Sequence, residues 1–353
     1  MITLAQIMRD HQHAFIQTYG DNITGRHEHA MQAIINCHTP SCGQLEYHCV
    51  PCDQQQRFCH SCGHRSCPAC QHHSNNQWLD RQRQKLLPLD YYMVTFTLPA
   101  QLRGFVWHHQ KWAYHALFVA AKDTLSTFAK NDQQLESELG LTGVLHTHSR
   151  RLAYHPHVHF VVPNGGLDKK HMLWRNKAGK YLFNGKALAK VFRAKFIQAM
   201  KQQGYTLPRH VPKEWVVQCE QVGKGETALI YLARYLYRGI INEKNITHYD
   251  QDQVTFKYQD SHSKQWLTRT ESATKFLWLV LQHVLPKGFR RARDYGFLHS
   301  NAKKTLRRLQ WVLKAKVPDI DITHKRVHLC PCCGLIMDLI QVFKPRSYVQ
   351  PTN

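Results

Sequence analysis

The chain has 353 residues, enough for two or three domains of about 150 residues each, which excludes a chain too short to bury a core. Lysine and arginine number 47 against 24 aspartate and glutamate residues, and the resulting formal charge of +23 favours a polyanionic partner. The longest apolar runs, such as 276–281, are far below ~18 residues, which excludes a membrane-spanning helix. Residues 1–17 lack the apolar core of a signal peptide, so we expect a cytoplasmic protein with reduced cysteines.

The N-terminal segment carries most of the cysteines in the chain. Three C-x-x-C pairs follow two earlier cysteines, giving Cys37, Cys42, Cys49, Cys52, Cys59, Cys62, Cys67 and Cys70. A two-residue gap lets one tight turn present two thiolates to an ion, and a tetrahedral zinc site needs four such ligands. The sequence therefore predicts two structural zinc sites. Sequential and crossed pairings of the cysteines both fit, and histidines can replace Cys42 or Cys59.

Beyond this segment, strand-like and helix-like stretches alternate. Strands are predicted at 91–98, 143–148, 157–163 and 214–219, and helices at 106–129, 187–203 and 227–237. A strand pair is predicted at 254–258 and 265–268, then a helix at 272–285 and a basic helix-like stretch at 289–316. This order predicts an α+β fold. We expect three consecutive parts, namely 1–86, 87–245 and 246–353.

A smaller cysteine motif lies near the end of the sequence. Cys330, Cys332 and Cys333 form the run Cys-Pro-Cys-Cys-Gly, which supplies only half of a zinc site. His324 and His328 are close enough in sequence to complete it. A turn without metal is the alternative interpretation.

The segment 154–163 has the sharpest chemical signal. Successive side chains of a strand alternate between its faces, so His157 and His159 point together and Val158 packs on the other side. Two imidazoles on one face make half of a divalent-metal site. His155 is the expected third ligand, and His146 and His148 on the preceding predicted strand compete for that place.

A predicted helix over 227–237 carries a second signal. Tyr231 and Tyr235 are one helical turn apart, with Arg234 and Arg238 nearby to meet phosphates. A tyrosine can attack a phosphodiester and form a covalent phosphotyrosine, although a phenol of pKa about 10 needs help at neutral pH. A metal on the histidine strand would supply that help. Tyr237 is the next candidate nucleophile.

Several motifs in this order resemble those of the HUH single-strand endonucleases, and within them the two-tyrosine rolling-circle transposases of bacterial insertion sequences. The resemblance rests on the cysteine module with the run Arg-Ser-Cys-Pro-Ala-Cys at 65–70, on Val-Thr-Phe-Thr-Leu-Pro at 94–99, on the histidine segment followed by Pro-Asn-Gly-Gly at 163–166, on the tyrosine segment, and on Tyr-Gly-Phe-Leu at 295–298. It covers most of the chain. Cys42 and Cys59 are additional to the family pattern, and some relatives use one tyrosine.

The resemblance implies an antiparallel-sheet nuclease domain that cleaves single-stranded DNA. It places a catalytic Mg²⁺ or Mn²⁺ on His157 and His159, and the nucleophiles at Tyr231 and Tyr235. It implies a transposase that nicks the end of a mobile element, stays joined to the 5′ phosphate, and passes the strand to a target. The partners would be element ends and target DNA, and the bacterial protein would be nucleoid-associated.

Basic residues outside these motifs are candidates for DNA contact. They lie in two clusters, one beside aromatic residues and one near the C-terminus: Lys169, Lys170 and Arg175, and Arg290, Arg291 and Arg293. Basic side chains can follow a phosphate backbone while aromatic rings stack on unpaired bases. Solvated surface charge is the alternative interpretation for each cluster.

Two other functions remain as alternatives at this point. A plasmid replication initiator or relaxase would use the same chemistry, although the N-terminal cysteine module favours the transposase. A non-catalytic zinc-dependent DNA-binding regulator would form no covalent adduct. The sequence does not define the DNA end, the target, the zinc pairing, the third metal ligand or the oligomeric state.

Overall fold

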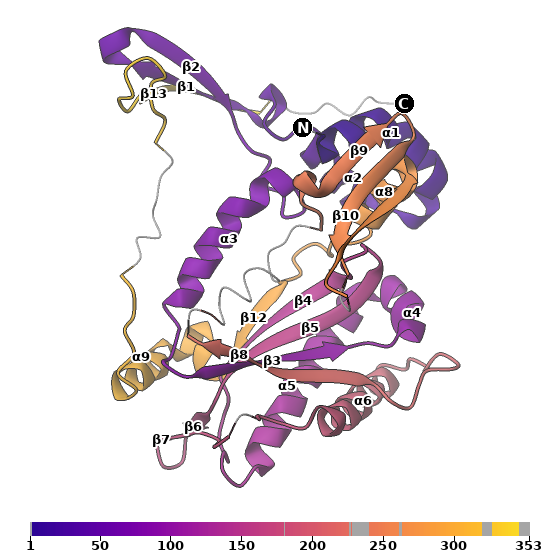
Figure 1. Ribbon diagram of the computed structural model, residues 1–353, viewed down its shortest axis with the longest axis vertical. Helices are drawn as coiled ribbons and strands as arrows, with labels where there is room; N and C mark the ends of the chain where they lie inside the picture. The colour runs from indigo at the N-terminus through magenta and orange to yellow at the C-terminus, as the bar shows by residue number, and fades with distance from the viewer. Residues whose placement is uncertain are drawn as a thin grey trace. The chain divides into compact units, whose positions relative to one another are not determined.

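A computed structural model describes residues 2–179, 181–225, 227, 240–260, 263–319 and 327–345, with the side chains of all of these except 71–75 (Figure 1). The chain forms two compact units. Unit 1 combines Met1–Gln77, Gly239–Val284 and Asp321–Asn353, and unit 2 combines Trp78–Arg238 and Leu285–Ile320. Helix α3 (Pro68–Arg83) begins in unit 1 and ends in unit 2.

The first part of unit 1 packs helices against a small sheet. The helices are α1 (Leu4–Tyr19), α2 (Gly25–Ile35) and α8 (Ala273–Leu281), and the antiparallel sheet has the order β11 (Trp266–Ser272), β10 (Gln253–Gln259) and β9 (Ile246–Asp250). Helix α1 begins where the Thr3 side chain accepts a hydrogen bond from the backbone N–H of Gln6 at 3.2 Å. It ends at Tyr19, whose ring stacks on Trp278 of α8 at 5.1 Å between centroids.

The second part of unit 1 is a three-stranded antiparallel sheet, which we call the ribbon. Its order is β13 (Asp338–Phe343), β1 (Gln44–Cys49) and β2 (Gln54–Cys59), so a strand from the C-terminal region pairs with an N-terminal hairpin. Figure 1 shows β13 in yellow beside the purple β1 and β2. Gly43, which precedes β1, has no room for a side chain, because a Cβ there would lie 2.7 Å from the carbonyl oxygen of Phe343.

The core of unit 2 is a five-stranded antiparallel sheet. Its strands lie in the order β12 (Ala292–Tyr295), β4 (Leu141–His148), β5 (Tyr154–Pro163), β3 (Asp90–Thr97) and β8 (Val216–Lys224). A separate hairpin consists of β6 (Gly166–Asp168) and β7 (Leu173–Arg175). The predicted α+β class and the antiparallel sheet are therefore confirmed.

Helices cover one face of this sheet. They are α4 (Arg103–His108), α5 (Gln110–Asn131) and α6 (Gly185–Gln202), whose apolar side chains form one core with inward residues of the strands (Figure 1). Val158, Phe160 and Val162 of β5 belong to this core and are fully buried. Because strand residues alternate, His157, His159 and Val161 point to the other face, where Val161 packs with Trp78, Tyr91 and Val144.

Two features differ from the sequence prediction. The stretch 289–316 is not one helix, because Ala292–Tyr295 forms the edge strand β12 and only Lys303–Val312 forms helix α9. The contacts also do not follow three consecutive parts. Residues 240–284 group with the N-terminal helices, where the hydroxyl of Tyr249 donates to Asp10 at 2.7 Å and the backbone N–H of Leu4 donates to Glu243 at 2.9 Å.

The fold makes a testable prediction at Gly143 of β4. This glycine pairs with the buried Phe160, and a Cβ at position 143 would lie 2.5 Å from the Phe160 ring. Gly143→Ala should therefore displace the ring and lower the free energy of unfolding by about 1–3 kcal/mol. Urea denaturation followed by circular dichroism measures this change.

Gly104 of α4 provides the matched control, because a Cβ there meets nothing within 4 Å. Gly104→Ala should leave the unfolding midpoint unchanged or raise it, since alanine favours the helix by about 0.5–1 kcal/mol. A Gly143→Ala protein as stable as the parent would contradict the close packing of Phe160 on this strand.

Candidate functional site

Three histidines converge on the sheet face opposite helices α4, α5 and α6. His146 of β4 lies directly across from His157 of β5, and His159 follows two residues later on the same face. Their ring centroids are 4.6 Å apart for His146 and His159, 4.8 Å for His157 and His159, and 5.2 Å for His146 and His157. One nitrogen from each ring lies within 4.8 Å of the others. We call this group the histidine triad.

Hydrogen bonds orient the rings of β5. The Nδ1 of His157 donates to the carbonyl oxygen of His155 at 2.7 Å, which leaves its Nε2 lone pair for a metal. The Nδ1 of His159 is 2.8 Å from the hydroxyl oxygen of Thr95 on β3. Within the described part of the chain, the buried Nε2 of His146 has no hydrogen-bond partner. A buried nitrogen without a partner is costly, and a bound cation would satisfy it.

Burial keeps the triad uncharged. Desolvation, followed by the neighbouring His159 and His157, lowers the pKa of His146 well below 6.5. Desolvation and the neighbouring His159 likewise lower the pKa of His157. Desolvation and Arg291 lower the pKa of His159 to about 4. Neutral imidazoles keep a lone pair at neutral pH, so this donor set fits a divalent cation.

The third member of the triad differs from the one predicted. His155 lies outside it, because its Nδ1 accepts a hydrogen bond from the Arg103 guanidinium at 3.0 Å. His148 also lies outside it, with its ring 6.0 Å from that of His146. His146 was one of the alternatives in the sequence, and the register of β4 against β5 selects it. Thr95 was not predicted as a site residue, and the only signal for it was its place in the motif 94–99.

The tyrosine segment lies outside the described residues. This applies to Tyr231, Tyr235 and Tyr237 and to the neighbouring Arg234 and Arg238.

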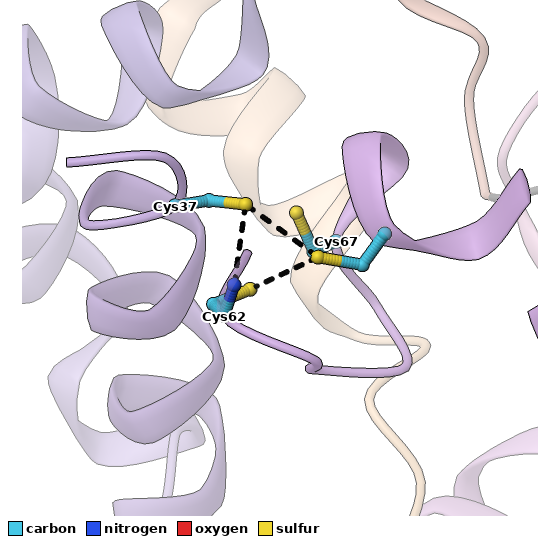
Figure 2. Close-up of side chains that lie close together, drawn as sticks. Cys37, Cys62 and Cys67 are labelled. Atoms are coloured by element: carbon cyan, nitrogen blue, oxygen red, sulfur yellow. Dashed lines mark hydrogen bonds between the residues drawn. The ribbon is translucent and has the colours of Figure 1, made fainter. Parts of the chain in front are cut away.

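The first cysteine group is in unit 1 and consists of Cys37, Cys62, Cys67 and Cys70, with all sulfurs within 4.8 Å of one another. Cys37 follows α2, Cys62 follows β2, and Cys67 and Cys70 flank the first residues of α3. Figure 2 shows Cys37, Cys62 and Cys67 pointing toward one another. A tetrahedron with Zn–S bonds of about 2.3 Å has edges of about 3.8 Å, so the group is close to zinc geometry.

Burial and hydrogen bonding disfavour four thiolates in this group when no cation is bound. A hydrogen bond from the Cys67 thiol lowers the pKa of Cys62 to about 5. Burial raises the pKa of Cys37 to about 12, and hydrogen bonding to Cys62 raises the pKa of Cys67. One thiolate therefore forms easily and opposes the others. Four thiolates can coexist here only with a positive ion among them.

Cys42 and Cys59 lie outside both cysteine groups, unlike the predicted arrangement. The Cys42 thiol donates to the backbone carbonyl of Asn36 at 3.0 Å. The Cys59 sulfur is 3.6 Å from the side-chain nitrogen of Gln44, which donates to it. Each sulfur thus has a partner other than a metal.

The second cysteine group also differs from the prediction. Cys49 and Cys52 of the ribbon hairpin meet Cys330 and Cys333 from the C-terminal motif. His328 lies outside the group, with its ring packed on Tyr47 at 4.4 Å, and His324 lies outside the described residues. The sequence placed these two cysteine pairs in different motifs.

The predicted DNA-contact residues have different environments. Arg175 donates to Asp168 at 2.7 and 2.9 Å, and Lys169 forms an ion pair with Glu138, so both charges already have acidic partners. The Arg293 guanidinium lies 4.3 Å from the centroid of the Phe118 ring, on the helix-covered face.

The remaining predicted contacts lie elsewhere. The Arg291 side chain donates to the carbonyl of Leu145 at 3.1 Å, and its charge acts on the triad. Lys170 and Arg290 are exposed. Among the predicted residues that the structure describes, Arg291 is therefore the one whose charge acts on the triad.

Comparisons with known proteins identify this combination of a cysteine-rich module and a histidine-bearing sheet. A family described as a putative transposase matches residues 140–305, and a transposase zinc-binding domain matches residues 7–98. The putative transposase y4qJ of Sinorhizobium fredii is 30% identical over 319 residues, which cover 84% of this chain and 80% of that protein. The transposase for insertion sequence element IS801 of Pseudomonas savastanoi pv. phaseolicola is 29% identical over 289 residues, covering 75% and 68%. No solved structure matches.

The class of protein is therefore a DNA transposase with a zinc-binding domain. The chain belongs to the transposase family of insertion sequences of the IS91 type. As a transposase it binds DNA and cleaves and transfers DNA strands. The matched domain and the cysteine groups together support structural zinc. Among the described helices, none is long and apolar enough to cross a membrane.

Acid should destabilise the metal-free protein through the triad. Between pH 6.5 and about 4, an unfolded His159 binds a proton that the folded chain excludes, so stability falls as the pH falls through this window. A shift from 6.5 to about 4 corresponds to roughly 3 kcal/mol for His159 alone. Unfolding by urea at a series of pH values, with chelator present, measures the profile.

The variant His159→Gln should show a shallower loss of stability over this window, because it removes one proton-binding group. His248→Gln, at an exposed position in β9 of unit 1, controls for the loss of a histidine elsewhere and should keep the parent profile. Equal profiles for the parent and His159→Gln would contradict the buried, neutral state of His159.

Proposed function

We propose that this transposase is a metal-dependent endonuclease and strand transferase that acts on single-stranded DNA through a covalent 5′-phosphotyrosine. The observation that carries the proposal is the histidine triad: three buried, uncharged imidazoles converge on one sheet face within a transposase. Such a donor set suits a divalent ion. The proposal extends the family assignment to a mechanism.

The chain's own residues would prepare the metal site. His146, His157 and His159 would hold the ion, while Thr95 and the carbonyl oxygen of His155 fix the rings of His159 and His157. The bound ion, Mg²⁺ or Mn²⁺, would polarise the scissile phosphate and neutralise developing charge. Arg291 adds a fixed positive charge near the same face, which favours a phosphate there.

The nucleophile would be Tyr231 or Tyr235. The phenolic oxygen bonds to phosphorus as the bond from phosphorus to the 3′ oxygen breaks, and the departing 3′ oxygen takes a proton. The products are a 5′-phosphotyrosine and a free 3′ hydroxyl. In strand transfer, the 3′ hydroxyl of the target attacks the same phosphorus and releases the tyrosine. Two tyrosines four residues apart in the sequence would allow two covalent links within one transposition event.

Replacing the tyrosines tests whether they form the covalent adduct and support strand transfer. With a labelled single-stranded oligonucleotide from an element end and Mn²⁺, the parent should give a covalent adduct on a denaturing gel. Tyr231→Phe and Tyr235→Phe should each impair strand transfer, and the double variant should form no adduct, because phenylalanine keeps the ring and removes the attacking oxygen.

Tyr237→Phe serves as the matched control and should keep the adduct, since residue 237 is not one turn from residue 231. An adduct formed by the double variant would move the nucleophile to another residue. No adduct with any element end, despite salt-sensitive DNA binding, would overturn the covalent mechanism.

Replacing the triad should remove cleavage but not DNA binding. His146→Ala, His157→Ala and His159→Ala should each lower the nicking rate at least about 100-fold, and Thr95→Val should weaken metal affinity about 10–100-fold. The triad contains no carboxylate, so Mn²⁺ should support nicking at lower concentrations than Mg²⁺. Nicking assays over a metal titration measure both effects, and gel shifts measure binding.

His155→Ala is the discriminating control, because His155 lies beside the triad but outside it. It should retain much more nicking than His146→Ala. The reverse ranking would make His155 the third ligand and reject the triad as described. Unchanged nicking in His157→Ala would reject the metal site altogether.

A further inference from the structure

The second cysteine group joins two segments that lie near opposite ends of the sequence. Cys49 and Cys52 belong to the hairpin of β1 and β2, whereas Cys330 and Cys333 come just before β13. The sulfurs all lie within 4.8 Å of one another, and the Sγ atoms of Cys49 and Cys333 are 3.5 Å apart. The zinc-binding domain match ends at residue 98, so it does not include the second pair.

Both pairs have the local geometry of a zinc-binding turn. Cys49 is followed by a 3-10 turn at Val50–Cys52. The turn after Cys330 is closed by the backbone N–H of Gly334, which donates to the carbonyl oxygen of Cys330 at 2.8 Å. Each turn then reverses through a left-handed residue, Asp53 with φ of 50° and Gly334 with φ of 74°. Two similar turns thus face each other and complete one four-sulfur site.

The ribbon has little apolar material to hold it together. Its buried core consists of Cys49, Cys330 and Met337, with Tyr47 and Cys52 packed at the edge. Much of β13 is exposed, including Leu339, Ile340 and Val342. A sheet with so small a core needs another source of folding energy, and a structural metal is the usual one.

We propose that a zinc ion bound by Cys49, Cys52, Cys330 and Cys333 clamps the C-terminal segment to the N-terminal hairpin. The metal makes β13 the third strand of the zinc-binding module, and the module is incomplete without it. Cys332 and Cys333 are both exposed, but only the Cys333 sulfur belongs to the four-sulfur group, so Cys332 is not one of the ligands. The proposal concerns folding of unit 1 and does not depend on the nuclease mechanism.

Differential alkylation tests the ligand set on the unmodified full-length chain. Purified protein is treated with iodoacetamide in its zinc-loaded state and again after removal of zinc with a chelator, and each cysteine is followed by peptide mass spectrometry. Cys330 and Cys333 should be protected in the zinc-loaded protein and should react after chelation. Cys332, two residues after Cys330 and directly before Cys333, is the internal control and should react in both states.

Cobalt substitution then tests how many four-sulfur sites the chain contains. The charge-transfer absorption from thiolate to Co²⁺ reports only sulfur-coordinated metal, so the histidine triad does not contribute. The parent should bind about two such ions and Cys330→Ser/Cys333→Ser about one. Adding Cys49→Ser/Cys52→Ser should cause no further loss, because the same site is already broken. Cys332→Ser should bind as much as the parent.

Two results would overturn the proposal. One is equal alkylation of Cys330, Cys332 and Cys333 in the zinc-loaded parent, which needs no variant to fold. The other is a Cys330→Ser/Cys333→Ser protein that keeps both sulfur-coordinated ions, since the N-terminal cysteines would then bind metal without the C-terminal pair.

Discussion

Burial of one side of β5 is the constraint on which the site depends. Val158, Phe160 and Val162 enter the core formed with the helices, and strand geometry then forces His157 and His159 onto the opposite face. A shift of one residue would exchange the two sets and place imidazoles in the apolar core. The packing that stabilises the sheet therefore also sets the direction of the triad's imidazoles on β5. Alternate residues of one strand thus serve the core and the candidate site.

The strands on either side of β5 supply the remaining residues of the candidate site. Pairing of His146 with His157 brings a third nitrogen across from β4, and β3 supplies the hydroxyl of Thr95 behind His159. The central position of β5 matters, because each side of it contributes a different component of the site. An edge strand would have had a neighbour on one side only.

Local periodicity was enough to predict which face of a strand the histidines share. It was not enough to predict which residues from separate strands meet. Alternation alone placed His157 and His159 on one face of a strand, but it could not choose among His146, His148 and His155. That choice depends on a register irregularity between His146 and His148 and on the hydrogen bond from Arg103 to His155. The short strand β12 was read as part of a helix because four residues between basic neighbours give almost no periodic signal.

The sequence also could not show that Cys49 and Cys330 meet, because they are far apart along the chain. Their meeting has a consequence for biosynthesis. Protein synthesis proceeds from the N-terminus, so the first cysteine group can assemble early on the ribosome, whereas the second must wait until Cys330 and Cys333 have emerged. A gene copy that has lost its 3′ end would still encode the histidine strand but not β13. Completion of the ribbon thus requires that synthesis continue through β13.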